Sequence, residues 1–442
     1  MTDTISMTTA AEPDGAPRIA TLDILRGIAI LGILFMNIND MGGSLWSMFA
    51  GDMRHLGWST ADQVAWWLRE ILANGTARCM LEMLFGAGMV ILTDRAATAA
   101  ATRWQVLRRY WFRSIVLFLF GVVHLLILLW PGDILHTYGL AALIAVLASR
   151  LRPRWLLVIG LNMAVLQLVG GTAGNIVVPM QRAQIAQLEA KQAAGQPLAK
   201  TDQEKLTKAH EAKAKRAKAK ADQAADVAAE DKARTGDVMS WVRFQWSVTE
   251  KIEKAGMEIL FVWEAASTML IGAALFKLGI LQGLRSRRYY IGLTMIAYTI
   301  GIVTRAIGAY EQTLSGDGPY IMWATSEIGR LGMTLGHIGL VNLLVTSVAG
   351  AKLLRPFVAA GRTALTLYIL QTIITLWILF PPFGFALYGH FTWAPLMVIA
   401  FVIDAVLLWV ANIWVRHYRI APVEWAWRSI IEGRRLPFRK VA

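Results

Sequence analysis

Long apolar stretches separated by short polar connectors dominate the chain. A membrane-spanning helix needs about 20 mostly apolar residues, and apolar runs of about that length recur along the sequence with few charges. The hydropathy pattern therefore predicts an all-α polytopic integral membrane protein with about ten transmembrane helices. The predicted spans are 22–41, 64–93, 106–130, 134–149, 155–178, 257–280, 289–308, 321–349, 357–380 and 393–414.

Basic residues gather in every second connector between these spans. Clusters of Lys and Arg occupy 94–113, 150–154, 277–288 and 350–362 and the tail after Arg416. The alternate connectors "WPGD", "YEQTLSGDGPY" and "PPFGFALYGH" contain neither Lys nor Arg. Because cytoplasmic loops are rich in Lys and Arg, an even count of spans places both termini in the cytoplasm.

The connector between the fifth and sixth spans is long and rich in Lys and Ala. We divide the chain into a polar cytoplasmic N-terminus (1–21), an N-terminal transmembrane half (22–180), an extracytoplasmic helical insertion (181–256) and a C-terminal transmembrane half with a basic tail (257–442). Residues 181–236 favour helix but are interrupted by Gly195-Gln196-Pro197, which predicts a solvated helical hairpin. It has too few large apolar residues for a core of its own. The alternative is a basic arm that touches anionic lipid or polymer.

Composition narrows the classes of function. The chain has 442 residues, of which 56% are hydrophobic and 17% are charged, and its mean hydropathy is +0.48. The net charge of +14 lies in the connectors, where membrane orientation explains it, so nucleic acid is not an expected partner. The single cysteine, Cys79, excludes an intramolecular disulfide.

No common cofactor or metal motif is present. The spans contain no His-x-x-x-His, Cys-x-x-Cys or Glu-x-x-His pair, so the sequence predicts no metal site. It also lacks a Walker loop, Gly-x-Gly-x-x-Gly and Gly-x-Ser-x-Gly, which argues against ATP hydrolysis, dinucleotide redox chemistry and an α/β-hydrolase triad. No bound cofactor is expected.

Several ionisable residues nevertheless lie within or beside the spans, where they are costly and usually functional. Arg78 and Glu82 are four residues apart, a helical spacing that allows an ion pair. His124, Asp133 and His136 flank the tight turn "WPGD". Asp133 stands where a helix N-cap is expected; either it only caps the helix, or it also holds His136 as a general base.

The first span carries polar groups at both ends. Asp23 lies three residues before Arg26 and can hold its guanidinium. Arg26 and Asn37 are eleven residues apart, so they share one helix face about 16.5 Å apart along the axis. This face is one wall of a polar path across the membrane; alternatively, Arg26 follows the positive-inside rule and Asn37 ends the helix.

Five stretches resemble a known bacterial family. The stretches "RIATLDILRGIAILGILFMNI", "LEMLFGAGM", "GDILHTYGL", "GRTALTLYILQTII" and "IAPVEWAWRSIIEGRRLPFR" are similar to the YeiB-like inner-membrane proteins, over roughly 18–180 and 256–440. This resemblance implies a location in the bacterial inner membrane. The insertion is not part of it.

The YeiB-like family in turn resembles the transmembrane acyltransferases. In one branch a catalytic His stands eleven residues after the Arg of Leu-Arg-Gly, but here that residue is Asn37, which cannot serve as a base. The heparan-type branch has Asn there and a His in the next outer loop, an order that His55 loosely matches.

The resemblance thus implies transfer of an acyl group from a cytoplasmic thioester of the acyl-CoA type, a co-substrate, to a cell-envelope acceptor at the outer face. Arg26 and Arg362 would bind the donor, His136 with Asp133 or else His55 would be the base, and Asn37 would stabilise the oxyanion. Further substrate-binding candidates are Asp23, His124, Glu82 and Gln371. The alternatives are a transporter or flippase, although we identify no internal repeat and no broken-helix pair, and a structural membrane partner. The sequence does not indicate an oligomeric state.

Overall fold

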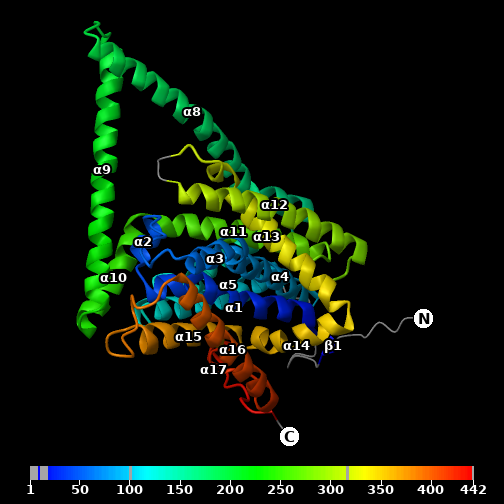
Figure 1. Cartoon of the computed structure of the whole chain (residues 1–442). Helices are drawn as coiled ribbons and strands as arrows, with labels where there is room; N and C mark the ends of the chain where they lie inside the picture. The colour runs from blue at the N-terminus through cyan, green and yellow to red at the C-terminus, as the bar shows by residue number, and fades with distance from the viewer. Residues whose placement is uncertain (1–7, 10–17, 99–101, 315–317, 441–442) are drawn as a thin grey trace.

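The computed structural model describes residues 8–9, 18–98, 102–314 and 318–440, with side chains omitted at 8–9, 18–19 and 95–98. Most of the predicted N-terminal segment 1–21 lies outside this part of the chain. Its described residues form a two-residue antiparallel ladder of β1 (Thr8–Thr9) and β2 (Arg18–Ile19). Helices make up nearly all the rest, which confirms the all-α fold class (Figure 1).

The helices of the N-terminal half and the insertion are α1 (Ala20–Gly42), α2 (Leu45–Phe49), α3 (Thr60–Leu68), the π-helix η1 (Arg69–Ala73), α4 (Thr76–Thr98), α5 (Arg103–Leu126), α6 (Leu135–Ala145), the 3-10 helix η2 (Val146–Ala148), α7 (Pro153–Gly160), α8 (Asn162–Ala193), α9 (Lys200–Arg234) and α10 (Val238–Lys254). Those of the C-terminal half are α11 (Met257–Lys277), α12 (Arg287–Thr313), α13 (Met322–Val345), α14 (Val348–Arg362), α15 (Ala364–Thr372), the π-helix η3 (Ile373–Leu379), α16 (Trp393–His417) and α17 (Pro422–Glu432).

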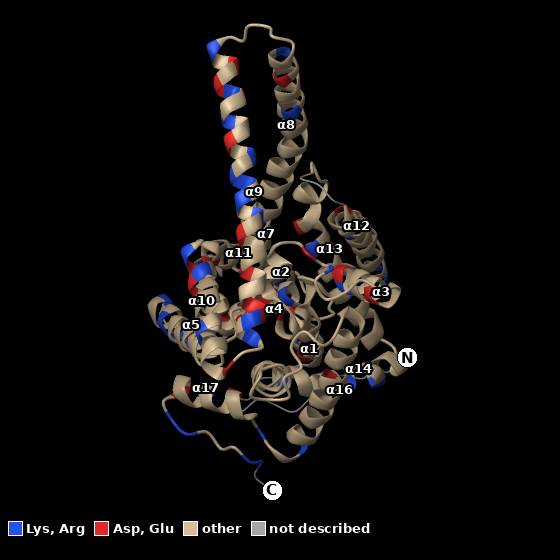
Figure 2. Cartoon of the chain, turned by 60° about the vertical axis from the view of Figure 1, so that its left-hand side comes forward, with Lys and Arg blue, Asp and Glu red and all other residues tan. Residues whose placement is uncertain are grey.

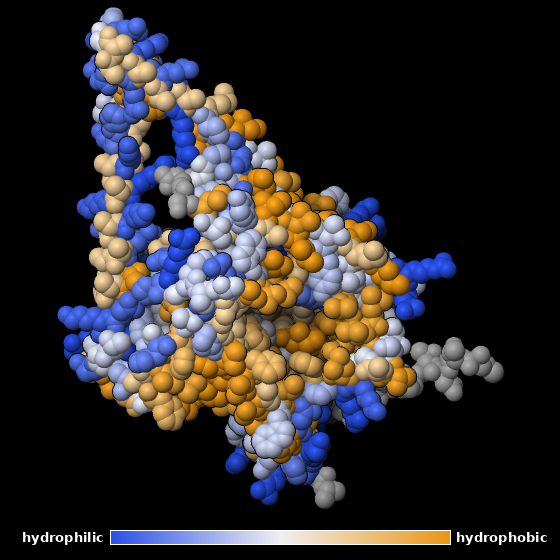
Figure 3. All heavy atoms as spheres, in the orientation of Figure 1, coloured by the Kyte–Doolittle hydropathy of each residue, from blue (hydrophilic) through white to orange (hydrophobic). Residues whose placement is uncertain are grey.

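Eight helical segments of the described chain are long and apolar enough to cross a membrane, and each overlaps a predicted span. The predicted span 134–149 forms a shorter apolar helix, Leu135–Ala148, below the length of a full crossing. Apolar side chains cover much of the face of the bundle that Figure 3 shows. Exposed apolar residues also include Val398, Phe401 and Trp409 of α16. Such a surface is stable against lipid and costly in water, so the protein is a membrane protein.

The predicted span 357–380 is interrupted by a bend. The chain instead forms α14 and the pair α15–η3, which are bent by 77° relative to each other. Glu424 of α17 explains the bend, because its carboxylate accepts the backbone N–H groups of Leu365 and Thr366 and the Thr366 hydroxyl at the start of α15. A carboxylate at a helix N-terminus satisfies the first free N–H groups. The bend also corrects the expectation that no helix pair is broken.

Helix α1 packs against α4, α14 and α16 near the middle of the bundle. Glycines permit the closest crossings. A Cβ on Gly27 of α1 would lie 2.1 Å from the carbonyl oxygen of Phe357, and one on Gly361 of α14 would lie 1.9 Å from that of Asp23. The glycines of "LRG" and "GR" therefore bring two backbones together, as small residues do at membrane helix interfaces.

Residues 181–236 form the predicted hairpin, with a break between Ala193 and Lys200. Its two arms meet at a tip clear of the bundle, and α9 returns along the edge of the molecule to α10 (Figure 1). Many Lys and Arg lie along α9 (Figure 2), and most of its side chains are exposed. The hairpin is thus helical as predicted, and the side chains at its tip and along the middle of the arm are exposed.

The base of the hairpin is not solvated. Glu230 is fully buried and accepts hydrogen bonds from the Ser44 hydroxyl and from the backbone N–H groups of Leu45 and Trp46, at 2.6–3.0 Å. Arg234 donates to the carbonyl oxygens of Asp40, Met41 and Gly43 at the end of α1. A carboxylate and a guanidinium therefore attach α9 to the junction between α1 and α2, where the sequence predicted a solvated hairpin or a basic arm.

Candidate functional site

The histidine cluster consists of His124, Asp133 and His136, which the structure brings together at the turn between α5 and α6. The two helices approach closely because a Cβ on Gly121 would lie 2.1 Å from the backbone nitrogen of His136. All three side chains are buried. The sequence predicted that these residues flank one turn. The contact at Gly121 determines how closely α5 and α6 approach each other there.

Asp133 connects the two imidazoles. Its Oδ1 lies 2.6 Å from Nδ1 of His124, and its Oδ2 lies 2.8 Å from Nδ1 of His136. Oδ2 also accepts the backbone N–H of His136 at 2.9 Å. The carboxylate therefore both caps the first turn of α6 and orients His136. Burial by itself would raise the pKa of Asp133, but the charge of His124 and the hydrogen bonds of both imidazoles hold that pKa well below its usual range.

The bent helix pair supplies two partners that sequence reasoning did not select. The Thr372 hydroxyl lies 2.8 Å from Nε2 of His124. The Tyr368 hydroxyl donates to Oδ1 of Asp133 at 3.3 Å and accepts the backbone N–H of Ile134. Both belong to the stretch "GRTALTLYILQTII", from which the sequence analysis selected only Arg362 and Gln371 as candidates. The histidine cluster thus joins the two halves of the chain.

His136 directs its second ring nitrogen toward the insertion and α11. Nε2 lies 3.2 Å from Oε2 of Glu258, whose other oxygen accepts the Thr137 hydroxyl at 2.9 Å. Glu253 of α10 approaches the same place, so that one ligand atom from each of His136, Glu253 and Glu258 lies within 4.8 Å of the others. These residues come from three helices, and no short motif search could have grouped them.

These groups line a cavity of about 170 Å³. Its walls come from α1, α2, α4, α5, α6, α10 and α11 and from the turn "WPGD". Asn37 is one of the lining residues, which places the predicted polar end of α1 at the cavity. The cavity therefore contacts the predicted acid–base residues and the predicted oxyanion residue together.

The cavity is acidic. Its lining includes one guanidinium, that of Arg78, and the carboxylates of Asp40, Glu82, Asp133, Glu253 and Glu258. Oδ1 of Asp40 is buried and has no hydrogen-bond partner in the described part of the chain. A buried oxygen without a donor is costly, and a lining with this excess of negative charge attracts cations.

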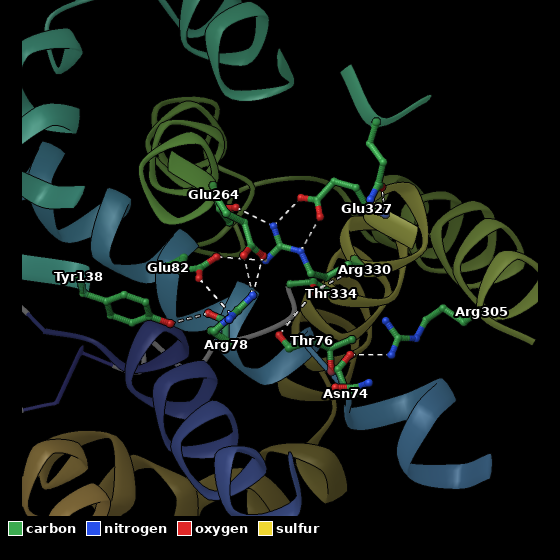
Figure 4. Close-up of polar contacts among 12 residues, drawn as sticks. Asn74, Thr76, Arg78, Glu82, Tyr138, Glu264, Arg305, Glu327, Arg330 and Thr334 are labelled. Atoms are coloured by element: carbon green, nitrogen blue, oxygen red, sulfur yellow. Dashed lines mark hydrogen bonds and ion pairs between the residues drawn. The ribbon is translucent and has the colours of Figure 1, made fainter. Parts of the chain in front are cut away.

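A second set of charges, the arginine network, adjoins the cavity. It comprises Arg78, Glu82, Glu264, Glu327 and Arg330 (Figure 4). Arg78 donates to both oxygens of Glu264 at 2.6–2.7 Å and lies 3.6 Å from Glu82, which confirms the predicted contact. Arg330 contacts Glu82 at 3.1 Å, Glu264 at 2.9 Å and also Glu327. Three carboxylates around two guanidiniums leave one negative charge without a partner of its own.

The predicted donor residues lie at the opposite end of α1. Arg26 and Asp23 form an ion pair at 2.9 Å, as the spacing predicted. Arg362 ends α14 at the bend and follows Gly361, whose backbone meets Asp23. The three residues thus belong to one helix crossing, and none of them lines the cavity.

Two other predicted residues lie elsewhere. His55 contacts Asp231 of α9 at 3.3 Å and does not line the cavity. Gln371 is buried and donates to the carbonyl oxygen of Ile30 and to Oδ1 of Asp404, also away from the cavity. Only the histidine cluster therefore places a predicted base in the cavity wall.

A bundle of apolar helices around a buried charged cavity defines a polytopic α-helical membrane protein. The chain is similar over most of its length to two YeiB-like relatives of matching length. It is 28% identical over 432 residues to the uncharacterized protein YeiB of Escherichia coli K12, covering 93% of this chain and 96% of the relative.

The second relative, the uncharacterized protein YxaH of Bacillus subtilis, is 26% identical over 422 residues, covering 93% of this chain and 94% of the relative. Residues 275–434 match the family described as protein of unknown function DUF418. No solved structure matches the chain.

Proposed function

We propose that this protein transfers an acyl group from a cytoplasmic acyl thioester to a hydroxyl acceptor at the outer face of the bacterial inner membrane. The observation that carries the proposal is the contact between Asp133 and Nδ1 of His136 in the cavity wall. A carboxylate that fixes one ring nitrogen leaves the other as the proton acceptor. In the proposed reaction the acceptor hydroxyl replaces Glu258 beside Nε2.

The proposed chemistry is an ordinary acyl transfer. Nε2 of His136 takes the hydroxyl proton while the oxygen attacks the thioester carbonyl, and Asn37 donates to the developing oxyanion. The carbon–sulfur bond then breaks, and the leaving thiolate takes the proton from the imidazolium. Arg26 and Arg362, at the other end of α1, suit a phosphorylated donor because guanidinium groups bind phosphate bidentately.

The acyl-transfer assay incubates the purified protein in lipid nanodiscs with radiolabelled acetyl-coenzyme A and envelope lipids. We expect His136→Ala to lower label transfer about 10²- to 10⁴-fold, the usual contribution of a general base. His55→Ala, outside the cavity, should transfer label like the wild type. His136→Gln, with thermal unfolding of each variant, separates lost chemistry from lost folding.

Equal transfer by folded wild type and His136 variants would contradict the assignment of the base. Absence of donor binding and transfer, together with solute flux in liposomes, would favour a transporter instead. The broken pair α14 and α15–η3 is the observation behind that second candidate, because transporters build substrate sites at interrupted helices.

The proposal includes an orientation with both termini in the cytoplasm and the hairpin outside. A reporter enzyme active only outside the cytoplasm, inserted at Gln196 in the hairpin break, is expected to be active in cells. The same reporter at the C-terminus should be inactive. The reverse result would refute the orientation, since the basic connectors would then face outward.

A further inference from the structure

Three side chains at the cavity form a set with the chemistry of a metal site. One ring nitrogen of His136 and a carboxylate oxygen from each of Glu253 and Glu258 lie within 4.8 Å of one another. In a tetrahedral zinc site the bonds to nitrogen and oxygen are about 2.0–2.2 Å long. Two neighbouring ligand atoms therefore lie roughly 3.4 Å apart. The distance of 3.2 Å between Nε2 of His136 and Oε2 of Glu258 is close to that spacing.

The surroundings of His136 match those of a metal-binding imidazole. Metal-bound histidines usually donate their other ring N–H to a carboxylate, which fixes the tautomer and the ring orientation. Asp133 accepts at Nδ1 of His136 and is itself held by His124. Nε2 is therefore free of Asp133 and faces Glu258.

The charge of the cavity provides an independent reason to expect a cation. Five lining carboxylates stand against two basic groups, the guanidinium of Arg78 and the imidazole of His136, and Arg78 is already engaged by Glu264 and Glu82. Oδ1 of Asp40, in the same wall, is buried without a donor among the described residues. A divalent cation would balance this charge, whereas an anionic ligand would add to the repulsion.

We propose that His136, Glu253 and Glu258 bind a divalent cation of the zinc class. One imidazole and two carboxylates form a ligand set known for zinc, with a fourth position open to water. The cation uses the lone pair of Nε2, which the proposed acyl transfer needs for the proton. On the assumption of that proposed function, the cation holds the enzyme inactive and its removal activates it.

The experiment measures binding directly and so does not depend on any activity. Full-length protein in nanodiscs is treated with a chelator, and Zn²⁺ is then titrated calorimetrically in the presence of excess Mg²⁺, which occupies loose carboxylate sites. We expect one tight site per chain, and at least tenfold weaker binding in both Glu253→Gln and Glu258→Gln. Co²⁺ titrations should show an absorption band of a nitrogen- and oxygen-ligated ion in the wild type only.

Glu250→Gln is the matched control, because Glu250 lies one turn earlier on α10, is exposed, and pairs with Lys254. It removes the same charge from the same helix and should leave zinc affinity unchanged. Equal zinc affinity of the wild type and both ligand variants, all with the thermal stability of the wild type, would overturn the site. If zinc binds as expected and acyl transfer is absent or insensitive to zinc, the site stands and the proposed function or its regulation fails.

Discussion

Arg330→Met is expected to destabilise the protein by about 3–5 kcal/mol, the usual cost of removing one partner from a buried ion pair. Arg330 is 6% exposed and contacts Glu82, Glu264 and Glu327. Without its guanidinium, three carboxylates share the single charge of Arg78 within the bundle, where there is little water to screen their repulsion. The free energy of unfolding in mixed micelles measures the loss.

A double variant tests the cause of this loss. Glu82→Gln in the Arg330→Met background removes one of the carboxylates left behind and should recover part of the stability. Arg305→Met is the comparison. Arg305 donates to the backbone carbonyls of Glu70 and Asn74, and it forms no ion pair with a carboxylate in the described part of the chain. A stability of Arg330→Met within about 0.5 kcal/mol of the wild type, the usual range for surface changes, would rule out the network as a structural element.

Gly361→Ala is expected to lower stability by about 3 kcal/mol, the upper end of the usual cost of added volume in a packed interior. The new Cβ would lie 1.9 Å from the carbonyl oxygen of Asp23. Because that oxygen is backbone, relief requires α1 and α14 to separate, which also moves the Asp23–Arg26 pair. Thermal unfolding of the purified protein provides the measurement.

Gly292→Ala is the matched control for that substitution. Gly292 lies within α12, and a Cβ there meets no atom within 4 Å. Since alanine is the better helix former by about 1 kcal/mol, this variant should be as stable as the wild type or more stable. Equal effects at both positions would show that the crossing of α1 and α14 does not depend on close backbone contact.

The sequence located the apolar helices because hydropathy is a local property of about 20 residues. It did not locate the bend at Arg362, since Glu424, the cause of the bend, lies 59 and 58 positions after Leu365 and Thr366, the residues that it binds. Glu424 binds the first N–H groups of α15 and thereby lets a second helix begin inside an apolar run. Hydropathy averaged over a window of residues shows only that the apolar run continues past this point.

The candidate site likewise combines contacts that are local in the sequence with contacts that depend on helix packing. The pairing of Asp133 with His136 was open to prediction because three residues of one turn connect them. Glu258, Tyr368 and Thr372 are separated from that turn by more than a hundred residues, and their positions follow from helix packing. His55 and Gln371 were chosen because their residue types suit the chemistry, yet neither lines the cavity. Residue type alone therefore does not identify the residues that face it.

The attachment of α9 has a mechanical consequence. The arm is a single helix of 35 residues, about 50 Å long, and Arg234 binds the last carbonyls of α1 at its base. Its tip is joined to α8, which packs against α13, so the two arms brace each other. A force applied to the tip would therefore reach the bundle both through α8 and through the end of the helix that carries Asn37 and Asp40.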